Sequence, residues 1–424
     1  MANAETAADK RKNAVRVRAG TLAKALADVT HVVGSKATVP ILSYVKINVA
    51  DGRMSIAATD LDIYVERELA TDDRDGPDGA KWVKGIKPFV VTLPAQKLSD
   101  VVRRFDKDAM VTIEAAGDLG WEWSGQVVVK AGRARFSLNA LPLCDWPAAM
   151  LVEPDAAMVI PVGVLADALH SVQHAVSTEE SRYYLNGVYV HPAQATGEPM
   201  TLNFAATDGH RLARKALDLP EGGASFPPMI WPRRAVDLLA KLLGEAEKLD
   251  APEPVMVCAN DGGARMRFDI GAADGGTVML ISKAIDGTFP DYSRVIPTIS
   301  DKVAIVPRDE LIAGLDRMAV LTTKDTKCIR TAFHKGVLEL HIRNADLGEA
   351  CEEVPCDYDG NSFVIGFNGD YWRTVLRAMA SDNVMIRMLD DAAPTLMVSA
   401  AEAKEADCEA HKLGQIHVLM PMRV

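Results

Sequence analysis

The sequence is poor in cysteine and has no long apolar run, and both absences narrow the class of protein. Its six cysteines are scattered without a CxxC pair, so neither a disulfide framework nor a zinc site is expected. No run of about 18 apolar residues is present to span a bilayer. The opening MANAETAADKRKN lacks the apolar core of a secretory signal, and we expect residues 1–13 to form a disordered tail. A cytoplasmic protein without a membrane partner is predicted.

Nucleotide and cofactor motifs are also missing. There is no GxxxxGK[ST] and no GxGxxG after a predicted strand, so no nucleotide, metal or other cofactor is expected. The net charge is −11 and the isoelectric point is near 5.4. This balance disfavours a chain that coats nucleic acid with its whole surface, because phosphate binding requires a local excess of Lys and Arg. A basic stripe on an acidic body is compatible with it.

What is present is an ordinary globular composition with an internal repeat. A chain of 424 residues, 48% hydrophobic and 25% charged, is expected to form about three domains. Apolar residues recur at helical spacing in LAKALADV from Leu22, LADALHSV from Leu165 and LIAGLDRM from Leu311. The offsets are 143 and 146 residues. Near-constant offsets predict three similar modules.

A second helix is predicted in each module, after a short strand. Pro94 and Pro232 stand where the first two of these helices begin, a position at which the missing N–H costs nothing. Asn368 takes this place in the third copy as a predicted N-cap. Each module reads helix, strands, helix, strands, so the fold class is α+β. We expect the domains to be residues 14–153, 154–299 and 300–424.

Each module also carries a predicted hairpin, and the middle one has unusual side chains at its corner. TLNFAATDGHRLARKAL, residues 201–217, turns at Asp208 and Gly209 and is followed by His210 and Arg211. The first copy has Leu-Asp-Ile at the matching place, residues 61–63. The fold therefore does not require the Gly-His-Arg-Leu sequence, which leaves chemistry, a polar turn and a docking surface as interpretations.

Catalysis and metal binding are the alternative interpretations of these histidines. Asp208 and His210 could form an acid/base pair of a repeat-built hydrolase, but no nucleophile or oxyanion donor accompanies them. His170 and His174 in HSVQH could bind a metal, but the Glu of HExxH and a third ligand are missing, which favours a solvated or inner-face pair.

Two polar stretches are predicted to lie outside the regular elements. Residues 71–85 are charged and rich in glycine and are expected to form an exposed hairpin insertion. Residues 400–415 are expected to be a loop before the last strand.

Several segments resemble a known family in family order. RYYLNGVYV, FAATDGHRLA, DGTFPDYSRVIP and the terminal VLMPMRV resemble signature segments of the bacterial sliding clamp, DNA polymerase III subunit beta. TVPILSYVKINVADGRMSIAATDLDI resembles its first-domain opening, and the similarity extends from about Val15 to Val424. The resemblance implies three similar domains, each with two helices packed inside antiparallel sheets. It also implies a head-to-tail homodimer that closes as a six-domain ring around duplex DNA.

The resemblance further implies a non-enzymatic processivity factor with defined partners. These are double-stranded DNA, bound independently of sequence, the replicative polymerase catalytic subunit, the clamp loader, and other proteins with a clamp-binding motif. Energy for opening the ring would come from a partner. A specialised clamp paralogue with altered partner or inhibitor binding is the nearer alternative, and the hydrolase with Asp208 and His210 is the more remote one.

Three sets of residues carry over to this chain by resemblance. A groove for short linear peptides would be lined by Leu185, Thr207, Gly209, His210, Arg211, Leu212, Pro290, Arg294, Val295, Thr395, Val418, Met420, Pro421, Met422 and Arg423. Thr395 would form a rim of that groove. DNA would be contacted by Lys36, Lys97, Arg103, Arg104, Arg182, Arg233, Arg234, Lys241, Lys324, Lys327, Arg330, Arg373 and Arg377. The dimer seam would contain Phe136, Leu138, Val320 and Leu321. Glu179 departs from the family pattern, because it places an acid beside the DNA-facing stretch.

Overall fold

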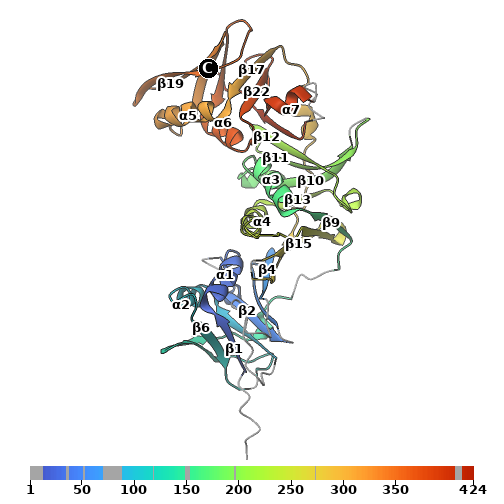
Figure 1. Ribbon diagram of the computed structural model, residues 1–424, viewed down its shortest axis with the longest axis vertical. Helices are drawn as coiled ribbons and strands as arrows, with labels where there is room; N and C mark the ends of the chain where they lie inside the picture. The colour runs from blue at the N-terminus through green and yellow to red at the C-terminus, as the bar shows by residue number, and fades with distance from the viewer. Residues whose placement is uncertain are drawn as a thin grey trace, which may run out of the picture. The chain divides into compact units, whose positions relative to one another are not determined.

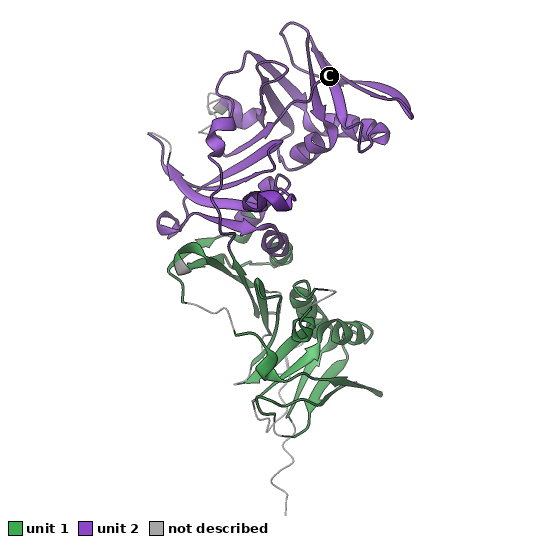
Figure 2. Cartoon of the chain, turned by 180° about the vertical axis from the view of Figure 1, so that it is seen from behind, with its two compact units in different colours: residues 1–163, 241–283 green, residues 164–240, 284–424 purple. Residues whose placement is uncertain are grey.

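The computed structural model describes nine stretches of the chain, which form two compact units. The described residues are 13–34, 38–50, 53–69, 88–117, 119–148, 153–194, 197–272, 274–405 and 413–424. One unit contains residues 1–163 and 241–283, and the other contains residues 164–240 and 284–424 (Figure 2). The predicted insertion at 71–85 lies outside the described residues, as does the predicted tail apart from Asn13. Asn13 is not in a tail, because it begins strand β1 and pairs with Ala115.

Both predicted helices of each module are present. The first helices of the three copies are α1 (Ala19–Thr30), α3 (Val162–Gln173) and α5 (Arg308–Met318). The second helices are α2 (Ala95–Val102), α4 (Arg233–Ala246) and α6 (Gly369–Arg377). In α1 the apolar stripe predicted from Leu22 is buried, including Leu26 and Val29.

The helix starts follow local chemistry. The Asn368 side chain accepts hydrogen bonds from the backbone N–H groups of Asp370 and Tyr371, at 3.0 and 3.3 Å, which confirms the predicted N-cap of α6. Pro94 is the extended N-cap residue of α2 rather than its first helical residue. The loop prediction for residues 400–415 is wrong at its start, where α7 (Ala400–Glu405) forms. Its alanines favour a helix, and Ala403 is fully buried.

The first unit has two antiparallel sheets. Its four-stranded sheet has the order β1 (Asn13–Arg18), β6 (Met110–Ala115), β7 (Gln126–Ala131), β8 (Ala134–Asn139). Its eight-stranded sheet has the order β5 (Phe89–Pro94), β2 (Tyr44–Ala50), β3 (Arg53–Thr59), β4 (Ile63–Leu69), β16 (Thr277–Lys283), β15 (Arg265–Gly271), β14 (Val255–Asn260), β9 (Ala156–Ile160). The two halves of this sheet join where β4 pairs with β16.

The second unit repeats this arrangement. Its eight-stranded sheet has the order β13 (Met229–Pro232), β10 (Gly187–Gln194), β11 (Met200–Thr207), β12 (Arg211–Asp218), β24 (Gln415–Leu419), β23 (Thr395–Ser399), β22 (Asn383–Met388), β17 (Lys302–Pro307). Its four-stranded sheet has the order β20 (Gly348–Pro355), β19 (Val337–Asn344), β18 (Cys328–His334), β21 (Phe363–Asn368). Here the halves join where β12 pairs with β24.

The sheet orders reveal a single repeating rule. Each eight-stranded sheet joins four strands of one copy to four strands of the next, through the pairs β4 with β16 and β12 with β24. The compact units therefore divide the middle copy, with β9 and β14–β16 in one unit and β10–β13 in the other. By the same rule, the equivalent of β4 and β12 in the third copy is β20, and the equivalent of β16 and β24 in the first copy is β8. Both lie at the edge of a four-stranded sheet.

The core of the third copy lies between its two helices and its strands. Figure 1 shows α5 and α6 side by side. Trp372, Val375 and Leu376 of α6 are fully buried and pack with Phe333 and Phe367 of the sheet. Each such side chain contributes roughly 1.5–3 kcal/mol through apolar burial. The opposite face of α6 is left for polar residues.

Among the residues that the structure describes, no helix is long and apolar enough to cross a membrane.

Candidate binding surfaces

The corner of the β11–β12 hairpin is held by a Thr-Asp pair. The Asp208 carboxylate accepts hydrogen bonds from the backbone N–H groups of His210 and Arg211, at 2.9 and 3.0 Å. The Thr207 hydroxyl donates to the Arg211 carbonyl and accepts from the N–H of Gly209. Gly209 has φ +87°, a left-handed conformation that glycine adopts without strain.

The first copy builds the same corner with different side chains. Asp60 accepts from the N–H groups of Asp62 and Ile63, and the Thr59 hydroxyl donates to the Ile63 carbonyl and accepts from the N–H of Leu61. Leu61 has φ +80°, although it is not a glycine. The Thr-Asp pair therefore sets the backbone in both copies. The residues after the aspartate are free to differ, as predicted for the middle copy.

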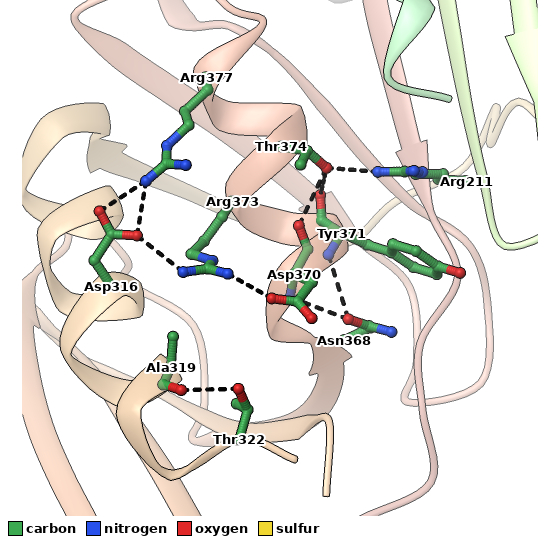
Figure 3. Close-up of polar contacts among 10 residues, drawn as sticks. All are labelled: Arg211, Asp316, Ala319, Thr322, Asn368, Asp370, Tyr371, Arg373, Thr374 and Arg377. Carbon is green, nitrogen blue, oxygen red and sulfur yellow. Dashed lines mark hydrogen bonds and ion pairs between the residues drawn. The ribbon is translucent and has the colours of Figure 1, made fainter. Parts of the chain in front are cut away.

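Arg211 and His210 connect this corner to α6. The Arg211 guanidinium donates to the Asp208 carboxylate at 3.0 Å and to the Thr374 hydroxyl at 2.5 Å, and it lies 4.4 Å from the centre of the Tyr371 ring. The His210 ring stacks on the same tyrosine, with 6.0 Å between ring centres. Figure 3 shows Arg211 reaching Thr374 beside Tyr371. Tyr371 and Thr374 were not predicted. Their only sequence signal is their place on the polar side of an amphipathic helix.

The hydrolase hypothesis does not fit this geometry. Both Asp208 oxygens are engaged, one by two backbone N–H groups and the other by Arg211. A carboxylate held in this way orients the turn and does not face the His210 imidazole as a base partner would. We therefore assign Asp208 to the corner.

The apolar residues predicted for the groove lie beside this corner, mostly beneath the surface. Leu212 and Val418 are opposite each other where β12 joins β24. They are 2% and 1% exposed, and Leu185 is 4% exposed. Thr395 pairs with Leu419 in the sheet and is fully buried, so its predicted position on the rim is wrong. The burial of Thr395 depends on neighbouring strands that are distant in the chain, so the single sequence could not predict it.

Exposed groove candidates come from two segments around the corner. The short helix η6 (Tyr292–Val295) presents Val295, which is 45% exposed, and Arg294, which pairs with Asp291 at 3.0 Å. Pro290, just before it, is also exposed. Tyr292, which was not predicted, packs against both the Leu185 cluster and the Leu212 cluster.

The C-terminal tail forms the other side. The N–H of Met420 donates to the His210 carbonyl at 2.9 Å. After Pro421, the N–H of Met422 donates to the Gly366 carbonyl at 2.8 Å. Met420 is 36% exposed. A Cβ on Gly366 would lie 2.7 Å from the Met422 carbonyl oxygen, so only glycine admits the tail here.

Met422 and Arg423 face a different space from the rest of the groove set. They line a cavity of about 670 Å³ with residues of β18, β19 and β20, including Cys328, Arg330 and Arg343. Ile329, Thr331 and Phe333 of β18 point into the core that α5 and α6 cover, and Arg330 points the other way. Arg330, a predicted DNA contact outside the helices, thus lies on the face of its sheet opposite to the helices. Lys327 lines the same cavity.

Arg182 also lies somewhere unexpected. Its guanidinium covers the hairpin corner, since a Cβ on Gly209 would lie 2.7 Å from Arg182 Nη1. It pairs with Glu179 at 2.8 Å, and its hydrogen bond lowers the pKa of the Glu179 carboxyl. The acid that departs from the family pattern thus holds an arginine against the candidate groove.

Several predicted DNA contacts of the first unit lie on helices or directly after them. The side chains of Lys241 and His31 are hydrogen-bonded. Burial lowers the pKa of His31, and the nearby charges of Lys241 and Arg103 lower it further. Lys97 belongs to α2, and Arg103 and Arg104 directly follow it. These cations are gathered on or beside the helices, and Asp28 and Glu245 lie near Lys241. Lys36 lies outside the described residues.

In the second unit, the predicted cations on the helices are balanced by acids. Arg233 approaches Asp237 at 3.7 Å within α4, and Arg234 follows it on the same helix. On α6, Arg373 and Arg377 both pair with Asp316 of α5. Lys324 precedes β18.

The predicted seam residues lie on exposed edges of the two units. Phe136 is 39% exposed on the edge strand β8, where Leu138 also lies, and its ring packs edge-on against Phe105 at 6.1 Å. In the second unit, Val320 of the short helix η7 (Ala319–Leu321) is 77% exposed, and Leu321 packs against the core. The edge strands have opposite charges, which we did not predict: β8 carries Arg135, and β20 carries Glu349 and Glu353.

His174 pairs with a histidine other than the predicted one. It directly follows α3, and its ring lies 5.3 Å from the ring of His417 on β24. Both His174 nitrogens are buried and bond to no described residue, whereas His417 contacts the Gln415 amide. Burial lowers the pKa of His417 to about 3 and also lowers that of His174, beside His417, Arg211 and His170. The expectation of a solvated or inner-face pair of His170 and His174 is wrong, because His174 points into the core.

Acid is expected to destabilise this histidine pair. A buried neutral histidine stabilises the fold fully above its unfolded pKa near 6.5, and this contribution is lost as the pH falls toward the lowered folded value. Two such groups lower the free energy of unfolding by roughly 2–3 kcal/mol between pH 7.5 and 5.5. Urea unfolding at both pH values measures this, and His417→Gln should remove about half of the dependence.

The informative quantity in that experiment is the difference between variant and parent in the pH dependence of the free energy of unfolding. Asp28, whose pKa burial raises to about 6, opposes the histidines, since it stabilises the fold more at low pH. An unchanged pH dependence in His417→Gln would contradict the assignment.

Comparison with known proteins gives one consistent match. Profiles of the N-terminal, central and C-terminal domains of the DNA polymerase III beta subunit match residues 14–150, 159–291 and 293–413. The chain is 34% identical over 409 residues to the beta sliding clamp of Caulobacter vibrioides strain NA1000, covering 96% of this chain and 99% of the relative. A solved sliding clamp from Bartonella birtlesii, bound to griselimycin, is 30% identical with a TM-score of 0.84, covering 97% of this chain and 100% of that one. A solved polymerase sliding clamp from Caulobacter crescentus is 34% identical with a TM-score of 0.81 and the same coverage.

Proposed function

The chain belongs to the DNA polymerase III beta subunit family, the bacterial sliding clamps, and from this premise we propose how it closes around DNA and holds its partners. It is a DNA sliding clamp, a processivity subunit that has no catalytic step of its own. Its partners are DNA and the replication proteins that bind clamps. We propose that it works in the cytoplasm, where the DNA it serves is replicated.

Ring closure is the central proposal, and one observation carries it. Each chain has two completed eight-stranded sheets and two separate halves, which end at β8 and β20. Because β4 pairs with β16 and β12 with β24, the same rule pairs β20 of one chain with β8 of another. Two chains joined head to tail at two such seams pair β8 and β20 of both chains and close six domains into a ring. The opposite charges of Arg135 on β8 and Glu349 and Glu353 on β20 favour this pairing.

We propose that the seam residues are Phe136 and Leu138 on one chain and Val320 and Leu321 on the other. The exposed area of Phe136 and Val320 supports this, since large apolar side chains exposed at an edge mark an interaction surface. The proposed domains are residues 14–153, 154–299 and 300–424. The three family profiles, which begin at residues 14, 159 and 293, support the division into three domains.

The helices are proposed to face DNA. A closed ring retains DNA by encirclement, so its contacts can be weak and independent of sequence. The proposed contacts on or beside helices are Lys97, Arg103, Arg104, Arg233, Arg234, Lys241, Arg373 and Arg377. The depressed pKa of His31, to which the charges of Lys241 and Arg103 contribute, supports a positive potential there. Arg182, Lys324, Lys327 and Arg330, which lie off these helices, stay proposed contacts at lower priority, as does Lys36.

The hairpin corner and the C-terminal tail are proposed to form the peptide groove. Its accessible part consists of Gly209, His210, Val295 and Met420, above a floor of Leu185, Leu212 and Val418. Methionine and aliphatic side chains adapt to varied apolar anchors, and polar groups at the corner orient a peptide backbone. The Bartonella birtlesii clamp binds griselimycin, and we propose that this chain binds it too. The replicative polymerase catalytic subunit and the clamp loader are the proposed main partners.

Encirclement is tested by retention on DNA of different topology. The clamp, loaded onto a nicked circle by a clamp loader, should stay bound at a salt concentration that removes it from short linear duplex. Cutting the circle once should then release it. Equal retention before and after cutting would mean that adhesion holds the DNA, and would overturn the proposal. Heat-treated clamp is the control for incomplete loading.

A further inference from the structure

Two arginines of α6 that we propose to face DNA are held by carboxylates of the same domain. Arg373 donates to Asp316 of α5 at 3.1 Å, and Arg377 donates to both oxygens of Asp316 at 2.8 and 2.9 Å. Arg373 also pairs with Asp370, one turn back on α6, at 2.5 Å. Figure 3 shows the Asp316 side chain on α5 facing both guanidinium groups on α6.

This cluster lies on the outer side of the helix pair. Trp372, Val375 and Leu376 bury the other side of α6 in the core. The side chains of Asp316 and Arg377 are 40% and 55% exposed, so a phosphate can reach them, whereas Arg373 is 23% exposed. Two arginines are matched by two carboxylates, and the surface is close to neutral.

A guanidinium offers the same pair of parallel N–H donors to a carboxylate as to a phosphate. Both contacts of Arg377 to Asp316 use the same nitrogen, Nη2, so a phosphate competes with Asp316 for that nitrogen. Exposed ion pairs are weak and easily exchanged, so the displacement is easy in both directions. Asp316 is well placed to reduce the lifetime of each contact between this helix and the DNA backbone.

We propose that Asp316 is a positioning residue that competes with DNA phosphate for Arg377 and Arg373. The inference rests on the proposed DNA-facing role of the helices. By this inference α5 has a second role besides packing, because its Asp316 weakens the contacts between the third domain and DNA. The ring can then slide, while encirclement prevents its dissociation. The helix surface of the first unit, with Lys241 and Arg103, then makes the stronger contacts.

The test compares Asp316→Asn with Asp309→Asn. Asp309 lies on the same helix and, among the described residues, pairs with Arg308. Its substitution therefore changes the net charge equally without touching α6. For a short fluorescent duplex at 50 mM salt, Asp316→Asn should bind about three to ten times more tightly than Asp309→Asn. The plot of log affinity against log salt should become steeper by about 1–2, because each new phosphate contact adds about 0.9. Tracked on long DNA, loaded Asp316→Asn clamps should diffuse more slowly.

A second substitution separates competition from a structural effect. Arg377→Gln in the Asp316→Asn background should remove most of the gain in affinity and salt slope, whereas a merely looser helix pair would not restore the parent values. Equal affinities and slopes for Asp316→Asn and Asp309→Asn, in clamps that are retained on circles, would overturn this inference alone. Loss of retention on circles by the parent clamp would instead overturn the proposed function.

Discussion

Removal of Met420 to Val424 is expected to reduce peptide binding by at least about 100-fold, or about 2.7 kcal/mol, while the dimer persists. The truncation removes the Met420 side chain beside His210 and both backbone hydrogen bonds by which the tail docks, to the His210 and Gly366 carbonyls. The last strand, β24, ends at Leu419 and stays intact. Titration with a labelled peptide from the replicative polymerase subunit of the same bacterium measures the loss.

A shorter truncation is the matched control. Arg423 and Val424 line the cavity beside β18–β20 and do not reach the hairpin corner. Their removal alone should weaken the peptide by less than about fivefold. Binding that survives the five-residue deletion would show that the groove lies elsewhere, and equal losses in both truncations would assign recognition to the cavity.

Phe136→Asp is expected to convert the dimer to monomers, with dissociation favoured about 1000-fold. Each seam would lose roughly 2 kcal/mol by placing a charge on an apolar edge, and two seams break together when a head-to-tail pair separates. Because Phe136 also packs against Phe105, Val320→Asp is the second variant. Val320 is 77% exposed, so its substitution costs little in the folded chain. Mass photometry across a dilution series measures the shift.

Leu61→Asp is the control for the seam. Leu61 is an exposed apolar residue of the same domain, 46% exposed, on the hairpin corner and not on the edge strand β8. Its left-handed backbone tolerates aspartate. This variant should remain dimeric. Dimers of Phe136→Asp and Val320→Asp at the parent's concentration range would refute the proposed seam.

The architecture could be predicted from the sequence because its signals are local and repeated. Helix periodicity from Leu22, Leu165 and Leu311, the Asn368 cap and the hairpin turn each depend on a few neighbouring residues, and all are present. Helix α7 was not predicted, because the polar composition of residues 400–415 indicates a loop, whereas Ala400 and its neighbours have a high helix propensity.

The candidate sites were only partly predictable, since they depend on long-range contacts. Nothing near Arg182 in the sequence indicates that it covers Gly209, and nothing near Arg330 indicates which sheet face it occupies. Thr395 and His174 were misplaced for the same reason: burial is decided by strands far away in the chain. The partnership of Asp316 with Arg377 spans 61 residues and two helices, beyond the range of any local pattern.

The unmatched strands β8 and β20 have a consequence for how such a molecule must be handled in the cell. A chain with two complementary strand edges forms an open filament unless its curvature brings the two free ends together. Closure after two copies removes both ends at once. Opening one seam to admit DNA exposes one β8 edge and one β20 edge again. A protein that opens the ring must therefore also cover these two edges until the ring closes.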